Sequence, residues 1–142
     1  MPTNRILFTI KYFCFLMLFN LPILLSAQVS TSLNQSFKTD AAQSISIQVN
    51  SPNLKIVYIK GRRVLVETTV SVSIENSTLL HFMTQKGRYD LIQELDENTK
   101  CLNIIPKNKQ NLILVKGEKL KENISYTIYI PEEMAFIDLA NK

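Results

Sequence analysis

The pattern of apolar and polar positions predicts a chain built mainly of β-strands. Polar and apolar residues alternate with a period of two over residues 44–49, and the same alternation returns over residues 64–74 and 124–130. Such alternation is typical of a strand that buries one of its faces. Every even-numbered position from Val64 to Ile74 is apolar or threonine, so we expect these side chains to share the buried face.

Shorter segments with a weaker pattern complete the predicted sheets. These segments are residues 54–59, 88–95, 101–105, 112–115 and 135–139. Residues 88–95 and 101–105 flank a polar turn and are expected to form a hairpin. Residues 112–115 are wholly apolar, so we expect a short strand that is buried on both faces. The apolar segment 79–84 is compatible with a helix or a strand. A bend or a bulge is expected in the middle of residues 64–74, because one straight strand of that length would span about 36 Å.

Short strands separated by turn residues at regular spacing predict an all-β fold. The expected architecture is an antiparallel β-sandwich or a short β-solenoid-like stack of sheets, in a single domain over residues 44–142. Residues 28–43 are rich in Ser, Thr, Asn and Gln, and we expect them to form a polar linker or arm. Gly61, Gly87 and Gly117 each follow a lysine and precede a charged residue, which indicates three hairpin turns.

The N-terminal segment, residues 1–27, has the three parts of a secretory signal peptide. Arg5 and Lys11 precede an apolar run over residues 12–25, and small residues follow it up to Ala27. The run is interrupted and shorter than the about 20 apolar residues of a membrane-spanning helix. We therefore expect an N-terminal signal helix that is cleaved after Ala27, with an uncleaved membrane anchor as the alternative. The predicted destination is the periplasm, the cell surface or the extracellular space.

Removal of the signal segment changes both the net charge and the cysteine content of the predicted mature chain. The chain has 16 basic and 12 acidic residues, a net charge of +4, and losing Arg5 and Lys11 lowers that charge by two. So small a charge gives no case for nucleic-acid binding. Cys14 leaves with the signal segment, so Cys101 has no partner for an internal disulfide. An exported domain held by its core alone is more typical of bacteria than of small animal secreted proteins.

The residues with chemical potential each have a simpler structural interpretation. His81 is the single histidine and lies in an apolar run, where we expect a structural role rather than a zinc site or a catalytic triad. Cys101 begins an apolar segment and is expected to be a small buried residue. Lys60, Arg62 and Arg63 form the densest basic cluster, which we expect to be a solvated turn.

The carboxylates and tyrosines give no stronger signal. Asp96 with Glu97, and Glu132 with Glu133, are adjacent acids, whereas glycosidase chemistry needs two carboxylates about 5–10 Å apart across a cleft. The tyrosines that could line a carbohydrate platform are Tyr58, Tyr89, Tyr126 and Tyr129, and cross-strand packing accounts for them equally well. The sequence therefore predicts no catalytic, cofactor-binding or metal-binding residue, no cofactor and no enzymatic activity.

Three segments carry a resemblance to a known family. They are Ile-Ser-Tyr-Thr-Ile-Tyr-Ile-Pro at 124–131, Asn-Leu-Lys-Ile at 53–56 and Val-Leu-Val-Glu at 64–67. Together they resemble exported, adhesin-like β-solenoid proteins of the Bacteroidetes type, the head GIN or DUF4097-like domains. The signal exit, Leu-Leu-Ser-Ala-Gln, also suits that group. The resemblance implies a stack of short strands and an adhesin role, and it implies no catalytic residues.

The expected function is therefore that of a non-enzymatic interaction module of the cell envelope, adhesin-like in character. Its partner is expected to be another protein or a surface glycan, bound through an open sheet edge, with the terminal strand 135–139 as the candidate edge. Membrane contact is expected through the signal segment alone. The alternatives are a small secreted hydrolase, which requires His81 to converge with carboxylates, or a ligand-binding β protein with a cavity between its sheets.

Overall fold

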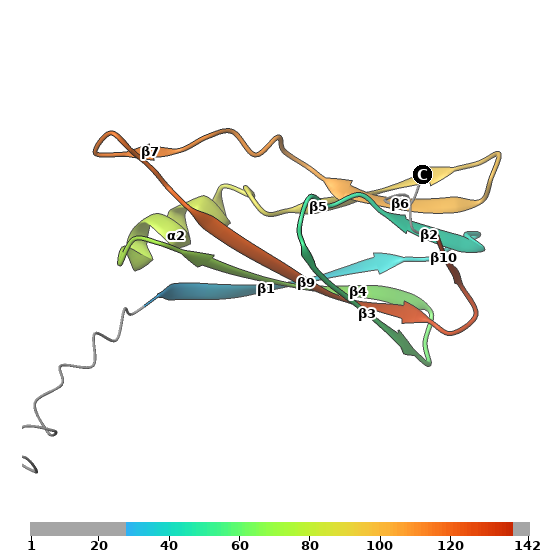
Figure 1. Ribbon diagram of the computed structural model, residues 1–142. Helices are drawn as coiled ribbons and strands as arrows, with labels where there is room; N and C mark the ends of the chain where they lie inside the picture. The colour runs from blue at the N-terminus through green and yellow to red at the C-terminus, as the bar shows by residue number, and fades with distance from the viewer. Residues whose placement is uncertain (1–27, 138–142) are drawn as a thin grey trace, which may run out of the picture.

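The computed structural model describes residues 28–137, and within them it shows two β-sheets packed face to face (Figure 1). The predicted signal peptide, residues 1–27, and residues 138–142 lie outside the described residues. The strands are β1 Val29–Lys38, β2 Ser44–Ile47, β3 Asn53–Ile59, β4 Arg63–Val72, β5 Leu91–Asp96, β6 Cys101–Pro106, β7 Leu114–Val115, β8 Glu118–Lys119, β9 Glu122–Pro131 and β10 Ala135–Ile137. The helix α2, Ser77–Gln85, lies between β4 and β5 along the chain. The prediction of an all-β fold is confirmed.

The two sheets have mixed rather than purely antiparallel pairing. The first sheet has the order β1-β4-β9-β3, the second has the order β10-β2-β6-β5, and β7 and β8 form a separate small hairpin. Strand β3 runs parallel to β9, and β2 runs parallel to both β6 and β10. Parallel neighbours need long connections. In this chain, the connection between two parallel neighbours passes through strands of the other sheet. A prediction that pairs strands only through hairpins therefore misses these parallel pairs.

The strongest predicted strand, β4, lies in the middle of the first sheet. Its even-numbered side chains from Val64 to Val72 are buried, as the alternation predicted. The ladder between β4 and β1 continues without a bulge from the pair of Val72 and Val29 to the pair of Arg63 and Lys38. A bulge in the middle of this strand, one of the two expected features, is therefore absent over residues 63–72.

The predicted linker 28–43 is wrong over most of its length, because residues 29–38 form β1. Val29, Leu33 and Phe37 face the core, while the intervening serines and Asn34 face solvent. Thr31 and Gln35 occupy the remaining inward positions and weaken the apolar signal in the sequence. The strand forms because ten residue pairs with β4 satisfy its backbone, and not because its own pattern is strong.

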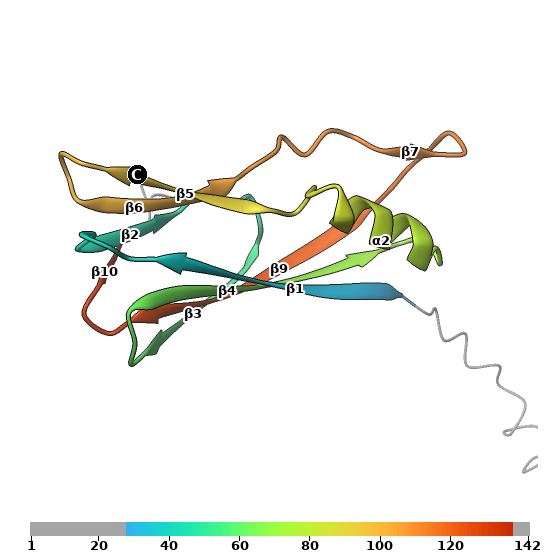
Figure 2. The same ribbon diagram turned by 180° about the vertical axis from the view of Figure 1, so that it is seen from behind.

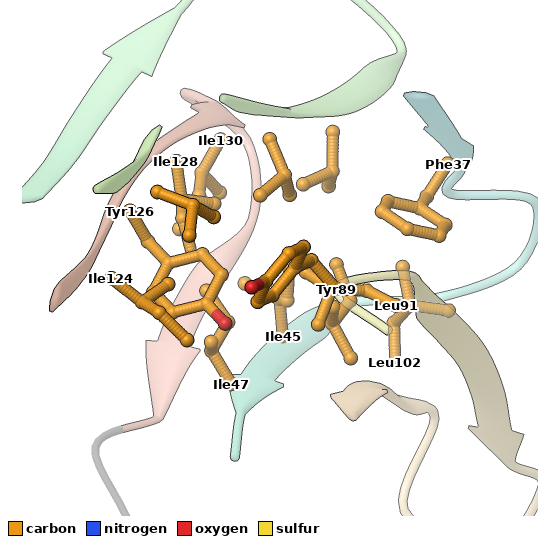
Figure 3. Packing of buried hydrophobic residues seen from close by; sticks show 14 of the residues in the cluster. Phe37, Ile45, Ile47, Tyr89, Leu91, Leu102, Ile124, Tyr126, Ile128 and Ile130 are labelled. Atoms are coloured by element: carbon orange, nitrogen blue, oxygen red, sulfur yellow. The ribbon is translucent and has the colours of Figure 1, made fainter. Parts of the chain in front are cut away.

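The core lies between the two sheets (Figure 3). The inward side chains of β9, which include Tyr126, Ile128 and Ile130, meet those of β2, which are Ile45 and Ile47. Burying a side chain of this size contributes about 1.5–3 kcal/mol. Because the cluster draws on residues from Phe37 to Met134, it makes one domain of the described chain.

The helix α2 covers the part of the first sheet that the shorter second sheet leaves open (Figure 2). It packs against β1 and buries Leu80 and Met83 in the core. The Oδ1 atom of Asn76 accepts from Leu79 N at 2.9 Å and caps the first turn. The apolar segment 79–84 is thus helical. Neither α2 nor any other helix in residues 28–137 is long and apolar enough to cross a membrane.

The prediction of a buried strand over residues 112–115 is wrong. Strand β7 has two residues, and the side chains of Leu112 and Leu114 are 60% and 61% exposed. Lys116 and Gly117, both with positive φ, form the two-residue turn that returns the chain into β8. The segment is held by this hairpin and by Ile113 and Val115, which are partly buried and pack against the core.

The side chain of Gln35 closes the sandwich along one side. Its Nε2 donates to Leu91 O at 3.0 Å, and its Oε1 accepts from Leu91 N at 3.0 Å. The amide thereby satisfies the first backbone groups of β5 from across the gap between the sheets. This contact fixes β1 of the first sheet against β5 of the second.

Candidate functional site

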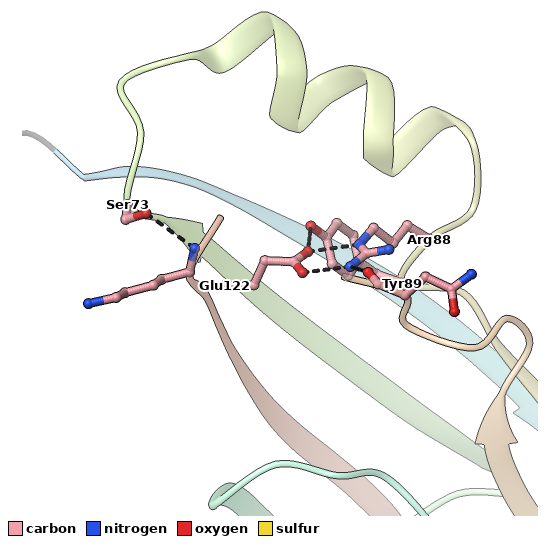
Figure 4. A network of polar contacts seen from close by, with 6 residues as sticks. Ser73, Arg88, Tyr89 and Glu122 are labelled. Atoms are coloured by element: carbon pink, nitrogen blue, oxygen red, sulfur yellow. Dashed lines mark hydrogen bonds and ion pairs between the residues drawn. The ribbon is translucent and has the colours of Figure 1, made fainter. Parts of the chain in front are cut away.

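A half-buried ion pair with a tyrosine partner joins three separate segments of the chain (Figure 4). Arg88 donates from Nε to Glu122 Oε1 at 2.8 Å and from Nη2 to Oε2 at 2.6 Å, which is the two-pronged geometry of a strong pair. The hydroxyl of Tyr89 donates to Glu122 Oε1 at 2.6 Å. Arg88 Nη2 also donates to the backbone oxygen of Asn111 at 2.7 Å. The network thus links the segment after α2, the start of β9 and the loop before β7.

The end of α2 positions Arg88 for these contacts. Gly87 has a φ of 70°, its N–H donates to Thr84 O at 2.9 Å, and the N–H of Arg88 donates to Met83 O at 3.1 Å. These two bonds and the left-handed glycine make a Schellman motif, which ends a helix and turns the chain sharply. Gly87 therefore closes α2, where the sequence had indicated a hairpin turn, and it directs Arg88 towards β9.

The contacts determine the charge state of the network. The hydrogen bond with Glu122 raises the pKa of Arg88. Burial alone would raise the pKa of Glu122, but the bonds from Arg88 and Tyr89 outweigh it and hold that pKa below its usual value. Burial, together with the bond to the carboxylate, raises the pKa of Tyr89. At neutral pH the network is a guanidinium, a carboxylate and a neutral phenol.

The ion pair forms part of the lining of a cleft of about 550 Å³. Six further polar residues line it beside the pair, namely Asn50, Gln110, Asn111, Lys119, Lys121 and Asn123. They come from the turn before β3, the loop before β7 and the junction of β8 with β9. Amides both donate and accept hydrogen bonds, whereas lysine ammonium groups donate and carry positive charge.

A second pocket of about 600 Å³ adjoins the first, with Asn50 and Gln110 lining both. It adds Lys107, Asn108 and Lys109 to the polar lining. Together the two hollows make a polar surface at one end of the sandwich, which we call the amide–lysine cleft and define by the lining residues of both pockets.

The amide–lysine cleft carries an excess of positive charge. Arg88 is neutralised by Glu122, and Lys107 Nζ lies 3.7 Å from Asp90 Oδ2. Among the described residues, Lys109, Lys119 and Lys121 form no ion pair. Their ammonium groups are exposed and remain available to an anionic ligand. No group of three or more His, Cys, Asp and Glu side chains suited to a metal ion occurs within residues 28–137.

The structure separates the residues that the sequence had raised as catalytic candidates. His81 is exposed on α2, beside a hollow lined with Val29, Ser30 and Thr31 and with no carboxylate. Cys101 is buried, as expected for a small apolar residue. Asp96 accepts from the backbone N–H groups of Asn98 and Thr99 and stabilises its own turn.

The basic cluster and the tyrosines also lie apart. Lys60 and Arg62 are exposed in the turn between β3 and β4 (Figure 1), and Arg63 is exposed at the start of β4. None of the three lines the amide–lysine cleft. Tyr58 is exposed on β3, whereas Tyr126 is buried in the core. The tyrosines therefore form no common platform.

The cleft itself was not predicted from the sequence. Its residues come from segments that are far apart along the chain, and Arg88 and Glu122 are 34 positions apart. One signal was available, because lysines recur at positions 107, 109, 116, 119 and 121 among amides and few acids. These lysines are more numerous than the basic residues around Arg62 but more widely spaced, and no short motif marks them.

Comparisons with known proteins leave the family open. No protein-family model matches the sequence, and no curated protein is significantly similar to it. A crystal structure of a "putative cell adhesion protein" from Clostridium sporogenes is similar, with 10% sequence identity and a TM-score of 0.40. The match covers 78% of this chain and 46% of the other chain. At this distance the similarity carries no argument about function.

Proposed function

We propose that this chain is an exported, non-enzymatic β domain of the cell envelope that binds an acidic glycan in the amide–lysine cleft. The observation that carries the proposal is the lining of that cleft, in which four amides and two unpaired lysines surround one hollow. Sugar hydroxyls pair with groups that both donate and accept, as amides do. Carboxylates or sulfates on the sugar would be met by the ammonium groups of Lys119 and Lys121.

Two further features support a binding role. The apolar side chains of Pro52 and Leu112 line the same cleft and can pack against a sugar ring. The walls are tied together by Arg88, so the cleft is held open before a ligand arrives. The signal pattern of residues 1–27 supports the envelope as the place of action.

The hydrolase alternative requires a different arrangement. It needs His81 beside carboxylates, and α2 instead holds His81 on its exposed face. Glu122 is the carboxylate that lines the cleft. Its Oε1 accepts hydrogen bonds from Arg88 and Tyr89, and its Oε2 accepts one from Arg88. Such a group supports the cleft wall and has little freedom to abstract a proton.

The test is binding of the purified protein to polygalacturonate, a polymer of uronic acids, with dextran as the neutral comparison. The double variant Lys119→Ala/Lys121→Ala is expected to weaken polygalacturonate binding by at least about tenfold, because each lost charge contact removes on the order of 1 kcal/mol. Isothermal titration calorimetry at fixed ionic strength measures the affinity. Dextran is expected to bind far more weakly than polygalacturonate.

The matched control is Lys60→Ala/Arg62→Ala, which removes the same charge from exposed residues that do not line the cleft. It is expected to leave the affinity unchanged. An equal loss in both double variants would show attraction to net charge rather than a site. Failure of the wild-type protein to bind polygalacturonate would rule out a uronic acid ligand for this cleft.

A further inference from the structure

The edge strand β3 is the least protected edge of the two sheets. Within residues 28–137 it pairs with β9 on one side only. The side chains of Leu54 and Tyr58 point to the inner side of the first sheet, yet they are 38% and 52% exposed. Exposed apolar residues on a free edge are a template for pairing with another strand.

The direction of the backbone groups can be read from one hydrogen bond. The oxygen of Ile59 accepts from Glu132 N at 3.0 Å, which places the backbone groups of Ile59 on the β9 side. In a parallel ladder these directions alternate along the strand. The N–H and C=O groups of Leu54, Ile56 and Tyr58 therefore point away from β9, towards the free side.

The other edges differ from β3. On β5, the side chain of Gln35 occupies the backbone groups of Leu91. On β1, the exposed side chains are serines, Asn34 and Lys38, so this edge offers no exposed apolar residue to a second strand. Strand β10 has three residues and so offers a much shorter template. Strand β3 has seven residues, and Lys55 is its single charged side chain. Charge, proline and short length are the usual protections of an edge, and β3 has little of any of them.

We propose that β3 pairs antiparallel with β3 of a second copy of this chain, about a twofold axis that passes through Ile56. In this register Leu54 lies opposite Tyr58 of the second copy, and Ile56 lies opposite its own equivalent. These are the three residues whose backbone groups point outward, so each opposing pair exchanges both of its hydrogen bonds. Their side chains also meet on one face as apolar cross-strand pairs.

The charges agree with this register. Lys55 faces Val57 of the second copy, so no two lysines stand directly opposite each other. The first sheets of the two copies become one continuous eight-stranded sheet, since each contributes four strands. An interface built on one strand is at the small end of the range, so we expect a dimer that dissociates on dilution. The amide–lysine cleft takes no part in it.

The test measures the association of the purified protein by sedimentation equilibrium over a range of concentrations. Tyr58→Lys and Leu54→Glu are each expected to weaken dimerisation by at least about tenfold, because each places a charge against an apolar side chain. An equimolar mixture of the two variants is expected to regain association. Only this register puts the introduced glutamate of one copy opposite the introduced lysine of the other.

Leu65→Lys is the control, because Leu65 is 41% exposed on the outer face of β4, away from the edge. It is expected to dimerise as the wild type does. Circular dichroism of each variant separates a loss of dimerisation from a loss of folding. Ile56→Pro is a further variant that is expected to weaken dimerisation, because it removes the N–H of Ile56, which points to the free side and donates nothing to β9. A wild-type protein that remains monomeric at high micromolar concentration overturns the proposal. So does a mixture that fails to associate while the wild type dimerises.

Discussion

Glu122 is the residue on which the most polar contacts depend. Its carboxylate accepts from Arg88 twice and from Tyr89 once, and Arg88 reaches onward to the backbone of Asn111. The side chains of Arg88 and Glu122 are each 14% exposed, so water does little to replace a lost partner. Such a pair specifies the position of its segments more than it adds to stability, and here it sets the shape of the cleft wall.

The ion pair makes stability depend on pH in a definite direction. Because the folded-state pKa of Glu122 is lowered, its contribution is present above the unfolded pKa, near 4.3, and is lost as the pH falls through the folded value. Glu122→Gln is expected to destabilise the fold at pH 7 by about 1–3 kcal/mol, since it removes charged hydrogen bonds. The difference from wild type is expected to shrink as the pH falls from 5 to about 3.

Urea unfolding at several pH values measures this difference. The control is Glu97→Gln, which removes an exposed pair with Lys100 and is expected to have a much smaller effect at pH 7. A gap between Glu122→Gln and wild type that stays constant down to pH 3 would contradict a charged pair at this position.

At the scale of elements, the turn after α2 decides where the network lies. Gly87 adopts the left-handed conformation that the Schellman motif needs, and a Cβ at this position would lie 2.6 Å from Asp90 Oδ2. Gly117 also has a positive φ, but a Cβ there would meet nothing within 4 Å. The two positions thus share a left-handed backbone conformation, which a side chain would strain, and they differ in the space around them.

Gly87→Ala is therefore expected to destabilise the protein more than Gly117→Ala. The strain common to both substitutions costs about 1 kcal/mol, and the contact with Asp90 adds to it at position 87 alone. Thermal or urea unfolding of both variants measures the difference. Equal losses would mean that Asp90 moves aside freely, and the double variant Gly87→Ala/Asp90→Ala would then show no recovery.

The elements predicted well are apolar or alternating segments bounded by turn residues. Strands β3, β4 and β9, and the hairpin of β5 and β6, lie within a few residues of their predicted ranges. Strand β1 was missed because Thr31 and Gln35 occupy inward positions, and its support comes from β4. The parallel pairs were missed because their partners are remote in sequence, and alternation records which side chains are buried but not which strands are neighbours.

At the scale of the whole molecule, a single amide fastens the two sheets along one side. Gln35 is part of β1, and its amide takes the place of a neighbouring strand on the free side of β5, at Leu91. Buried backbone groups that lose their partners are costly, so this side chain does more than fill space.

Gln35→Leu is expected to destabilise the protein by about 2–3 kcal/mol, because it leaves both backbone groups of Leu91 without a partner at similar side-chain volume. It is also expected to speed hydrogen exchange at the amide of Leu91. Asn34→Ala, next to it on the exposed face of β1, is expected to be near neutral. Unchanged exchange at Leu91 in the Gln35→Leu variant would refute the role given to this contact.

The amide–lysine cleft shows why a site of this kind escapes prediction from sequence. Asn50, Arg88, Gln110 and Lys119 belong to four segments that only the completed sandwich brings together. Each is ordinary in its own loop, where a polar residue is expected. The solvated turn around Arg62 was predicted correctly, since that property depends on neighbours in sequence alone.

The central place of β9 has a consequence for the order in which the chain can fold. It bridges β4 and β3, and Ser51 contacts Ile124 across 73 positions of sequence. A chain that emerges from its N-terminus can form the hairpin of β5 and β6 early, but the first sheet stays incomplete until residues 122–131 are available. Contacts so remote slow folding. The nascent chain therefore cannot complete its first sheet until most of it has been synthesised.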